Sequence, residues 1–266
     1  MLKRNEFHFE RRSILTAAQL RAIESFPREI LRIKYLDYGN GIISGVDFVQ
    51  HGEEIFTTEG IVKLGNFFYC ADAINLSALA KSAIGTFQYQ FVLTEPKRTT
   101  AENVTTEKIS LELKKFDEKF NGFEFANFKS GLKIKLPEID ATDLFKEFTK
   151  SSRLNLLNVP YSVRGGTTFH PYIFRAVLKK LELKKNPSPA DTALMIHLAN
   201  FGVATIPALK IYVQSNGVNW IDDSRENIFQ SILAAVQAEW KIKLPEKFSD
   251  TQVKVPTTPI CEDIFI

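Results

Sequence analysis

The sequence has 266 residues, of which 44% are hydrophobic and 24% are charged. These fractions are typical of a folded globular protein and exclude a disordered, collagenous or coiled-coil class for the whole chain. The length allows one large domain or two ordinary ones. The net charge of +3 is too small a bias to indicate a nucleic-acid partner, which usually requires a clustered basic face.

Phenylalanine is the unusual part of the composition, with 22 residues against 2 Met and 2 Trp. Each buried ring removes a large apolar area from water, so the chain can build a sizeable core from few positions.

The cysteines and the N-terminus indicate the compartment. Two cysteines, Cys70 and Cys261, are too few for the disulfide framework of a secreted protein. Cys70 follows three aromatic residues and is predicted to be a buried core thiol. A disulfide between Cys70 and Cys261 is an alternative, but a reducing compartment, in which both remain thiols, is the simpler interpretation. The N-terminus becomes charged at once, and no apolar run approaches the roughly 20 residues that span a bilayer. We expect a cytoplasmic protein, or part of an assembled particle, with no direct membrane insertion.

The first local signal is a helix start. Thr16 and Gln19 have the spacing of a capping box, in which each side chain bonds the backbone N–H of the other residue. Because Pro27 disfavours helix at Phe26, this helix is predicted to be short. The stretch 30–36 is consistent with either helix or strand.

From Gly41 onward, glycines recur at short intervals with apolar runs between them, which is typical of successive antiparallel strands. The polar, Thr-rich stretch 95–106 is interpreted as an exposed loop. Together the runs predict an N-terminal antiparallel β-sandwich or barrel. The expected strands are 42–49, 55–58, 67–71, 87–93, 108–114, 123–125 and 132–136.

Beyond Pro137 the hydrophobic period changes to that of helices. One helix is predicted to open at His170, a second to begin at Ser188 as N-cap and stop before Gly202, and a third to be capped by Asp222 or Asp223. Three amphipathic helices predict a small helical bundle, and the fold class is therefore α+β.

The predicted organisation has three parts. Residues 1–140 form a β-rich domain with a short N-terminal helix, 141–246 form a helical domain, and 247–266 form an extended C-terminal tail. The junction lies between 137 and 168. The tail ends in Ile264, Phe265 and Ile266, which have no core of their own, so they form a candidate interface that packs on this chain or on a neighbour.

The sequence contains no recognisable catalytic, cofactor-binding or metal-binding motif. The four histidines do not have metal-ligand spacing, and no nucleophile signature occurs. Arg164-Gly165-Gly166 precedes a helix, where backbone N–H groups can hold an anion. It lacks the spacing of a phosphate-binding loop, so a flexible domain linker is favoured. We expect no enzyme activity and no cofactor.

Three short motifs carry a family resemblance: residues 41–48 (GIISGVDF), 59–62 (EGIV) and 65–69 (GNFFY). This succession resembles the strands of phage-tail and contractile-injection baseplate proteins. The order of elements is similar to the N-terminal shoulder of the type VI secretion baseplate adaptor, in which a helical lead-in precedes a β-sandwich and a helical bundle follows. The present chain is shorter than that adaptor and shows no third domain.

The resemblance implies a non-catalytic structural component that assembles with other baseplate or tail proteins and forms a homo-oligomer. An alternative is a carbohydrate- or ligand-binding β-sandwich with exposed aromatic residues in a groove, for which the candidates are Tyr161, Tyr212 and Trp220. An uncharacterised enzyme is a third possibility, and it would require a pocket that gathers polar residues from distant segments.

Overall fold

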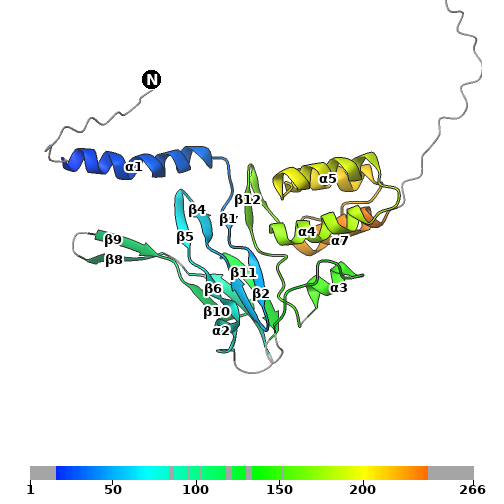
Figure 1. The fold of residues 1–266 in the computed structure, drawn as a ribbon, viewed down its shortest axis with the longest axis horizontal. Coiled ribbons are helices and arrows are strands. Elements are labelled where there is room, and N and C mark those ends of the chain that lie inside the picture. Colours follow the sequence, from blue (N-terminus) through cyan, green and yellow to red (C-terminus); the bar gives the residue numbers. More distant parts are fainter. Residues whose placement is uncertain are drawn as a thin grey trace, which may run out of the picture.

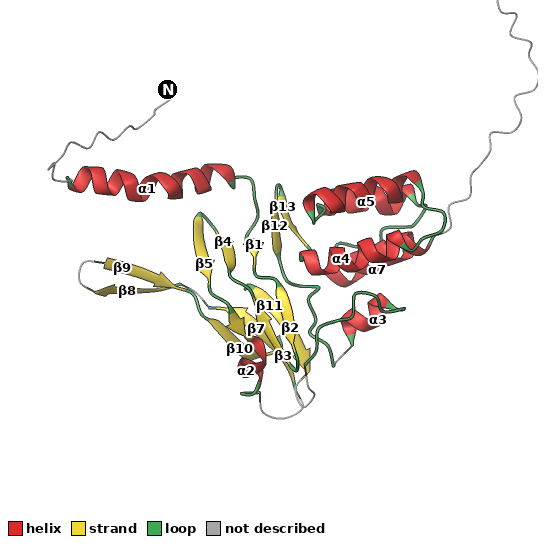
Figure 2. Ribbon diagram, viewed as in Figure 1, coloured by secondary structure: helices red, strands yellow, loops and turns green. Residues whose placement is uncertain are grey.

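The computed structural model describes residues 16–83, 87–94, 96–101, 104–117, 122–129, 134–150 and 152–238. Strands dominate the first part of the chain and helices the second, which confirms the predicted α+β class (Figure 1). The strands gather on one side and the later helices on the other, while the first helix lies beside the strand region and away from the other helices (Figure 2).

The largest sheet has five strands in the order β13-β12-β1-β4-β5. Strand β12 pairs with β1 in parallel, and the other neighbours are antiparallel. Its members are β1 (Gly41–Gly45), β4 (Gly60–Leu64), β5 (Phe67–Ala71), β12 (Tyr161–Val163) and β13 (Gly166–Thr168). Because β12 and β13 come from the later part of the chain, this sheet takes strands from both sides of residue 140. The division into domains at that residue stays a prediction.

Three smaller sheets complete the strand region. Two have three strands, in the orders β10-β7-β11 and β2-β3-β6, and the last is the β8-β9 hairpin. Their bounds are β2 (Phe48–His51), β3 (Glu54–Thr57), β6 (Ile74–Asn75), β7 (Gln88–Leu93), β8 (Lys97–Ala101), β9 (Val104–Lys108), β10 (Leu111–Lys115) and β11 (Glu124–Lys129).

The structure corrects some of the predictions for the strand region. The stretch 95–106 contains β8 and most of β9 instead of a loop, since its threonines are β-branched and favour strands. An ion pair between Arg98 and Glu107 also joins the two strands.

The predicted strand 42–49 is two strands, because Gly45 and Val46 both have positive φ, at 67° and 55°. A Cβ at Gly45 would lie 2.1 Å from the carbonyl oxygen of Glu59, so glycine is required there. Of the predicted strand 132–136, residues 134–136 are described, and they contain only an isolated parallel bridge from Lys135 to Arg153, whereas 132 and 133 lie outside the described residues.

The helices are α1 (Ala17–Lys34), α2 (Leu76–Ala80), α3 (Leu144–Thr149), α4 (Pro171–Glu182), α5 (Pro189–Phe201), α6 (Ile206–Ser215) and α7 (Arg225–Gln237). The caps of α5 are as predicted, with Ser188 in a capping box and Gly202 in the left-handed conformation. Helix α7 is capped by Ser224 rather than by either predicted aspartate, while Asp222 accepts a 2.8 Å bond from the Ser224 N–H.

Helix α1 is longer than predicted. The capping box of Thr16 and Gln19 is present, but the helix continues through Pro27 to Lys34. A proline removes one intrahelical hydrogen bond, which is a local cost. The ion pair of Glu24 with Arg28 spans the proline and that of Glu29 with Arg32 follows it, and both support the helix there.

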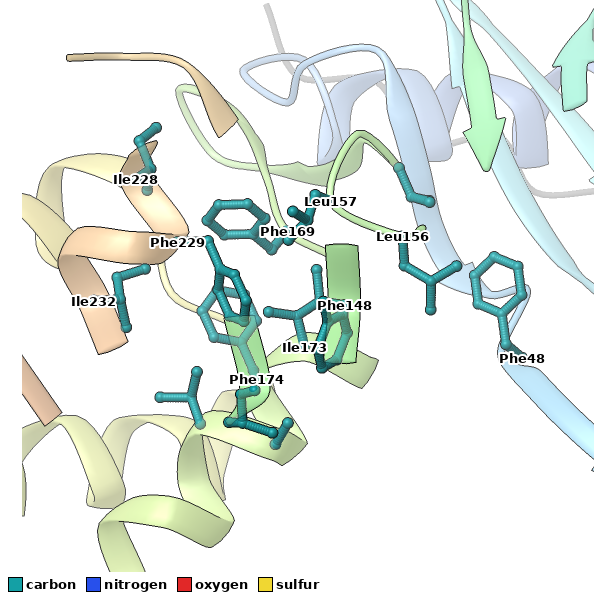
Figure 3. Close-up of a cluster of buried hydrophobic side chains, with 14 of the residues drawn as sticks. Phe48, Phe148, Leu156, Leu157, Phe169, Ile173, Phe174, Ile228, Phe229 and Ile232 are labelled. Carbon is teal, nitrogen blue, oxygen red and sulfur yellow. The ribbon is translucent and has the colours of Figure 1, made fainter. Parts of the chain in front are cut away.

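One buried cluster joins the strands to the helices. Its side chains extend from Phe48, on the strand side, through Leu156 and Phe148 to Ile232 on α7 (Figure 3). Helix α4 packs against α5 and α7, and α6 packs against the same two helices. Most of the excess phenylalanine in the described residues serves this core, although Phe87 and Phe201 are 53% and 70% exposed.

Candidate protein–protein interface

Helix α1 has few contacts with the rest of the described chain. It has 18 residues, so it is about 27 Å long, and none of them is buried. It extends past the β4-β5 hairpin and away from the other helices (Figure 1). A helix of this length in water normally needs tertiary packing of an apolar face to be stable.

The apolar side chains of α1 lie along one face. Leu20, Ile23, Phe26, Ile30 and Ile33, which we name the α1 stripe, follow one another at spacings of three and four residues, and they are 42–62% exposed. The second half of the stripe was not predicted, because Pro27 indicates an early end of the helix, although Ile30 and Ile33 continue the same spacing.

The charged face of α1 is the one that points to the protein's own sheet. Arg21, Glu24, Arg28 and Arg32 line a hollow of about 460 Å³ whose other wall is the β4-β5 turn at 66–68. An amphipathic helix of a closed globular protein normally has the opposite arrangement, with its apolar face turned to the core. The inverted orientation leaves the α1 stripe facing solvent.

The C-terminal end of α1 is held firmly. The Tyr35 ring contacts Tyr38 edge-on, with centroids 5.0 Å apart, and also packs against Phe68 at 5.9 Å. The Lys63 ammonium, whose residue is only 6% exposed, donates to the carbonyl oxygens of Tyr35, at 2.9 Å, and Tyr38. These contacts fix the direction in which α1 leaves the sheet.

The other predicted interface, Ile264, Phe265 and Ile266, lies outside the described residues.

The three candidate ligand-stacking residues come from different elements. Tyr161 is on β12 with its ring edge-on to His170, and Tyr212 on α6 is 4% exposed with its hydroxyl bonded to Asp191 at 2.8 Å. Trp220 follows α6 and donates to Asp223 at 2.9 Å. Burial of Tyr212 leaves no free ring face for a ligand.

Two further expectations are corrected. Cys70 is exposed rather than buried, since it lies on β5, the edge strand of its sheet. Arg164 and Gly165 form the turn of the β12-β13 hairpin rather than a linker, and the Gly165 N–H donates to the Asp37 carbonyl oxygen at 2.8 Å. The Arg164 side chain is 79% exposed and pairs with Asp37 at 3.4 Å.

His170 connects the strand region to the helices. It caps α4 by accepting a 3.2 Å bond from the Tyr172 N–H at Nδ1, and Nε2 lies 3.2 Å from the carbonyl oxygen of Val46. The neutral ring with its proton on Nε2 satisfies both contacts. Burial lowers the pKa of His170 from 6.5 to about 4, more strongly than the nearby Asp47 carboxylate and the Val46 carbonyl raise it.

This burial predicts an acid-sensitive fold. Between pH 6.5 and 4 the unfolded chain binds a proton at His170 that the folded chain does not, so stability falls as the pH falls through this window. The expected loss from this residue is about 3 kcal/mol. Urea unfolding of the wild type and His170→Gln at several pH values measures it. The variant should lose less stability across the window than the wild type does, whereas the exposed-site control His51→Gln should match the wild type. Parallel wild-type and His170→Gln curves would refute the assignment.

Among the described residues, no helix is long and apolar enough to cross a membrane, and no group of three His, Cys, Asp or Glu side chains is placed to hold a metal ion.

Comparison with known proteins gives one structural likeness to report. No protein family and no curated protein matches the sequence. Among solved structures, the chain is similar to one from the TssK-TssF-TssG baseplate subcomplex of the type VI secretion system, determined by cryo-electron microscopy. The identity is 11%, the TM-score is 0.31, and the match covers 90% of this chain and 100% of that chain. Because the TM-score is this low, we draw neither fold nor function from the likeness.

Proposed function

We propose that this protein is a non-catalytic structural component of a phage-tail-like or contractile secretion baseplate, where it assembles with other baseplate proteins and with copies of itself. The observation that carries the proposal is the α1 stripe. Five large apolar side chains on a projecting helix face solvent while the charged face of the same helix points inward. Contiguous exposed apolar surface of this kind marks interaction sites.

The family resemblance supports a phage-tail-like or contractile baseplate as the particle in which the chain assembles. The three motifs that carry it correspond to β1 with the start of β2, to β4, and to β5. Strands β1, β4 and β5 are neighbours in one sheet, and α1 enters the fold next to them through the contacts of Tyr35. The resemblance and the α1 stripe therefore belong to one continuous part of the molecule.

Sedimentation of particles tests the proposal. A tagged full-length chain, produced in its native cell, should co-sediment with assembled contractile particles in a density gradient, in a constant ratio to the sheath protein. A chain found only at the top of the gradient, in cells that contain assembled particles, would refute the proposal. The ligand-binding alternative predicts instead that the purified chain binds a glycan array.

A further inference from the structure

The α1 stripe has a symmetry of its own along the helix. Leu20 and Ile33 lie at equal distances from the Phe26–Pro27 peptide, and so do Ile23 and Ile30. Phe26 and Pro27 flank the centre. A two-fold axis that passes through this centre, perpendicular to the helix, places Ile23 of one chain at the level of Ile30 of another. A surface with this property is suited to an isologous contact between identical chains.

We propose that α1 pairs with α1 of a second copy of this chain in an antiparallel arrangement. The inference rests on the proposed function, which includes assembly with copies of the same chain, and it names the contact. The two stripes cover each other in the pair, and the charged faces remain turned to the hollows beside the β4-β5 hairpins.

Charge and shape favour the antiparallel direction over the parallel one. Arg28, Arg32 and Lys34 lie in the second half of α1, and Glu29 is the only acidic residue among them, so the basic charge is concentrated at this end. A parallel pair would bring two basic ends together, whereas an antiparallel pair separates them and opposes the two helix dipoles. In the antiparallel pair the rest of each chain, which is joined to its own α1 at Tyr35, lies at the opposite end of the helix pair from the rest of the other chain.

The area of the stripe is sufficient for a weak, specific contact. Each half-exposed side chain of this size contributes roughly 80 Å². A symmetric pair therefore buries on the order of 800 Å² of apolar surface, and the flanking atoms of both helices bring the total toward the roughly 1,200 Å² at which specific interfaces begin. We expect a dissociation constant on the order of micromolar.

Analytical ultracentrifugation of the full-length chain tests the contact, over concentrations from about 1 to about 100 µM. The wild type should show a monomer–dimer equilibrium. The double variant Ile23→Glu/Ile30→Glu places charges in the contact and should raise the dissociation constant at least about 100-fold. The matched control Arg21→Glu/Ser25→Glu adds the same two carboxylates on the side that lines the hollow, and it should dimerise much more readily than the stripe variant. Circular dichroism checks that both variants fold.

Disulfide trapping tests the direction, in a Cys70→Ser/Cys261→Ser background. Chains with Ile23→Cys and chains with Ile30→Cys, carrying different tags, should form mixed disulfides faster than either forms a disulfide with itself. Disulfides formed mainly between like chains would indicate a parallel pair and overturn the proposal.

The possible failures are distinguishable. A dimer that persists in Ile23→Glu/Ile30→Glu overturns the α1 contact without affecting the proposed function. A wild type that is monomeric throughout, yet co-sediments with particles, also overturns it and assigns the stripe to another protein or to the preceding residues of this chain. A monomer absent from particles overturns both proposals.

Discussion

Replacement of Phe229 with alanine is expected to lower the free energy of unfolding by about 4 kcal/mol, since it removes a large ring and leaves a cavity that the surroundings fill only in part. Phe229 is completely buried on α7, and its ring lies 5.4 Å from Phe148, 6.2 Å from Phe169 and 6.5 Å from Phe145, measured between centroids. These partners come from α3 and from the segment before α4 (Figure 3). The substitution therefore weakens three elements at once.

Urea unfolding followed by circular dichroism measures this loss. The control is Phe201→Ala at the end of α5, which removes the same side chain from a position that is 70% exposed. It should change the free energy of unfolding by no more than about 0.5 kcal/mol. If both variants lost similar stability, the core would not be centred on Phe229. Since domains are stable by only about 5–15 kcal/mol, the Phe229 variant should also give less folded protein.

Replacement of Asp191 with alanine is expected to cost about 3–5 kcal/mol, because it leaves a largely buried ammonium group without its carboxylate. Asp191 is fully buried in the first turn of α5. It accepts bonds of 2.7 Å from the Lys184 ammonium, 2.7 Å from the Ser188 N–H and 2.8 Å from the Tyr212 hydroxyl. The Lys184 side chain is only 12% exposed. These bonds join the α4-α5 connection to α6.

Thermal unfolding distinguishes this cluster from ordinary helix capping. Glu226→Ala removes a carboxylate from the first turn of α7, where the residue is exposed, and should cost at most about 1 kcal/mol. Adding Lys184→Met to Asp191→Ala removes the unpaired charge and should restore part of the lost stability. No recovery in the double variant would mean that the ion pair is not the source of the loss.

The Asp191 cluster also adds a second acid-sensitive step. Burial alone would raise the pKa of Asp191, but the bonds from Lys184, Ser188 and Tyr212 outweigh it, so the net pKa lies below its ordinary value of 3.8. The stability from this carboxylate is therefore present above the unfolded pKa and is lost as the pH falls through the folded pKa. This window lies below that of His170, so the two residues contribute in successive pH ranges.

Half of the candidate interface could be read from the sequence. The capping box of Thr16 and Gln19 and the apolar pair Leu20 and Ile23 indicate an amphipathic helix locally. Pro27 predicts an early end of the helix, so the sequence alone does not assign Ile30 and Ile33 to helix or strand. Neither the sequence pattern nor any local rule states that the apolar face points away from the domain. That orientation depends on the contacts of Tyr35 with Lys63 on β4 and with Phe68 on β5.

Sequence by itself determined the α+β class and the caps of α5, because periodicity and caps are properties of neighbouring residues. Ser188, Pro189 and Gly202 act within a single turn of helix, so no other part of the chain is needed to predict them. The apolar stripes of α4 and α7 are likewise confirmed, since a 3.6-residue period identifies a buried face without naming what it packs against.

Only the tertiary structure decided which distant segments meet. The pairing of β1 with β12 joins Ile42 to Tyr161, and it converts a suspected linker at Arg164 into a hairpin. The contact of His170 with Val46 spans 124 residues, and burial at this junction lowers the pKa of the histidine. Hydrophobic pattern shows that a segment has a buried face, but strand order and helix direction depend on the sum of contacts between residues far apart in the chain. For this reason the excess of phenylalanine could be counted in the sequence, while the solvent-facing stripe of α1 could be found only in the fold.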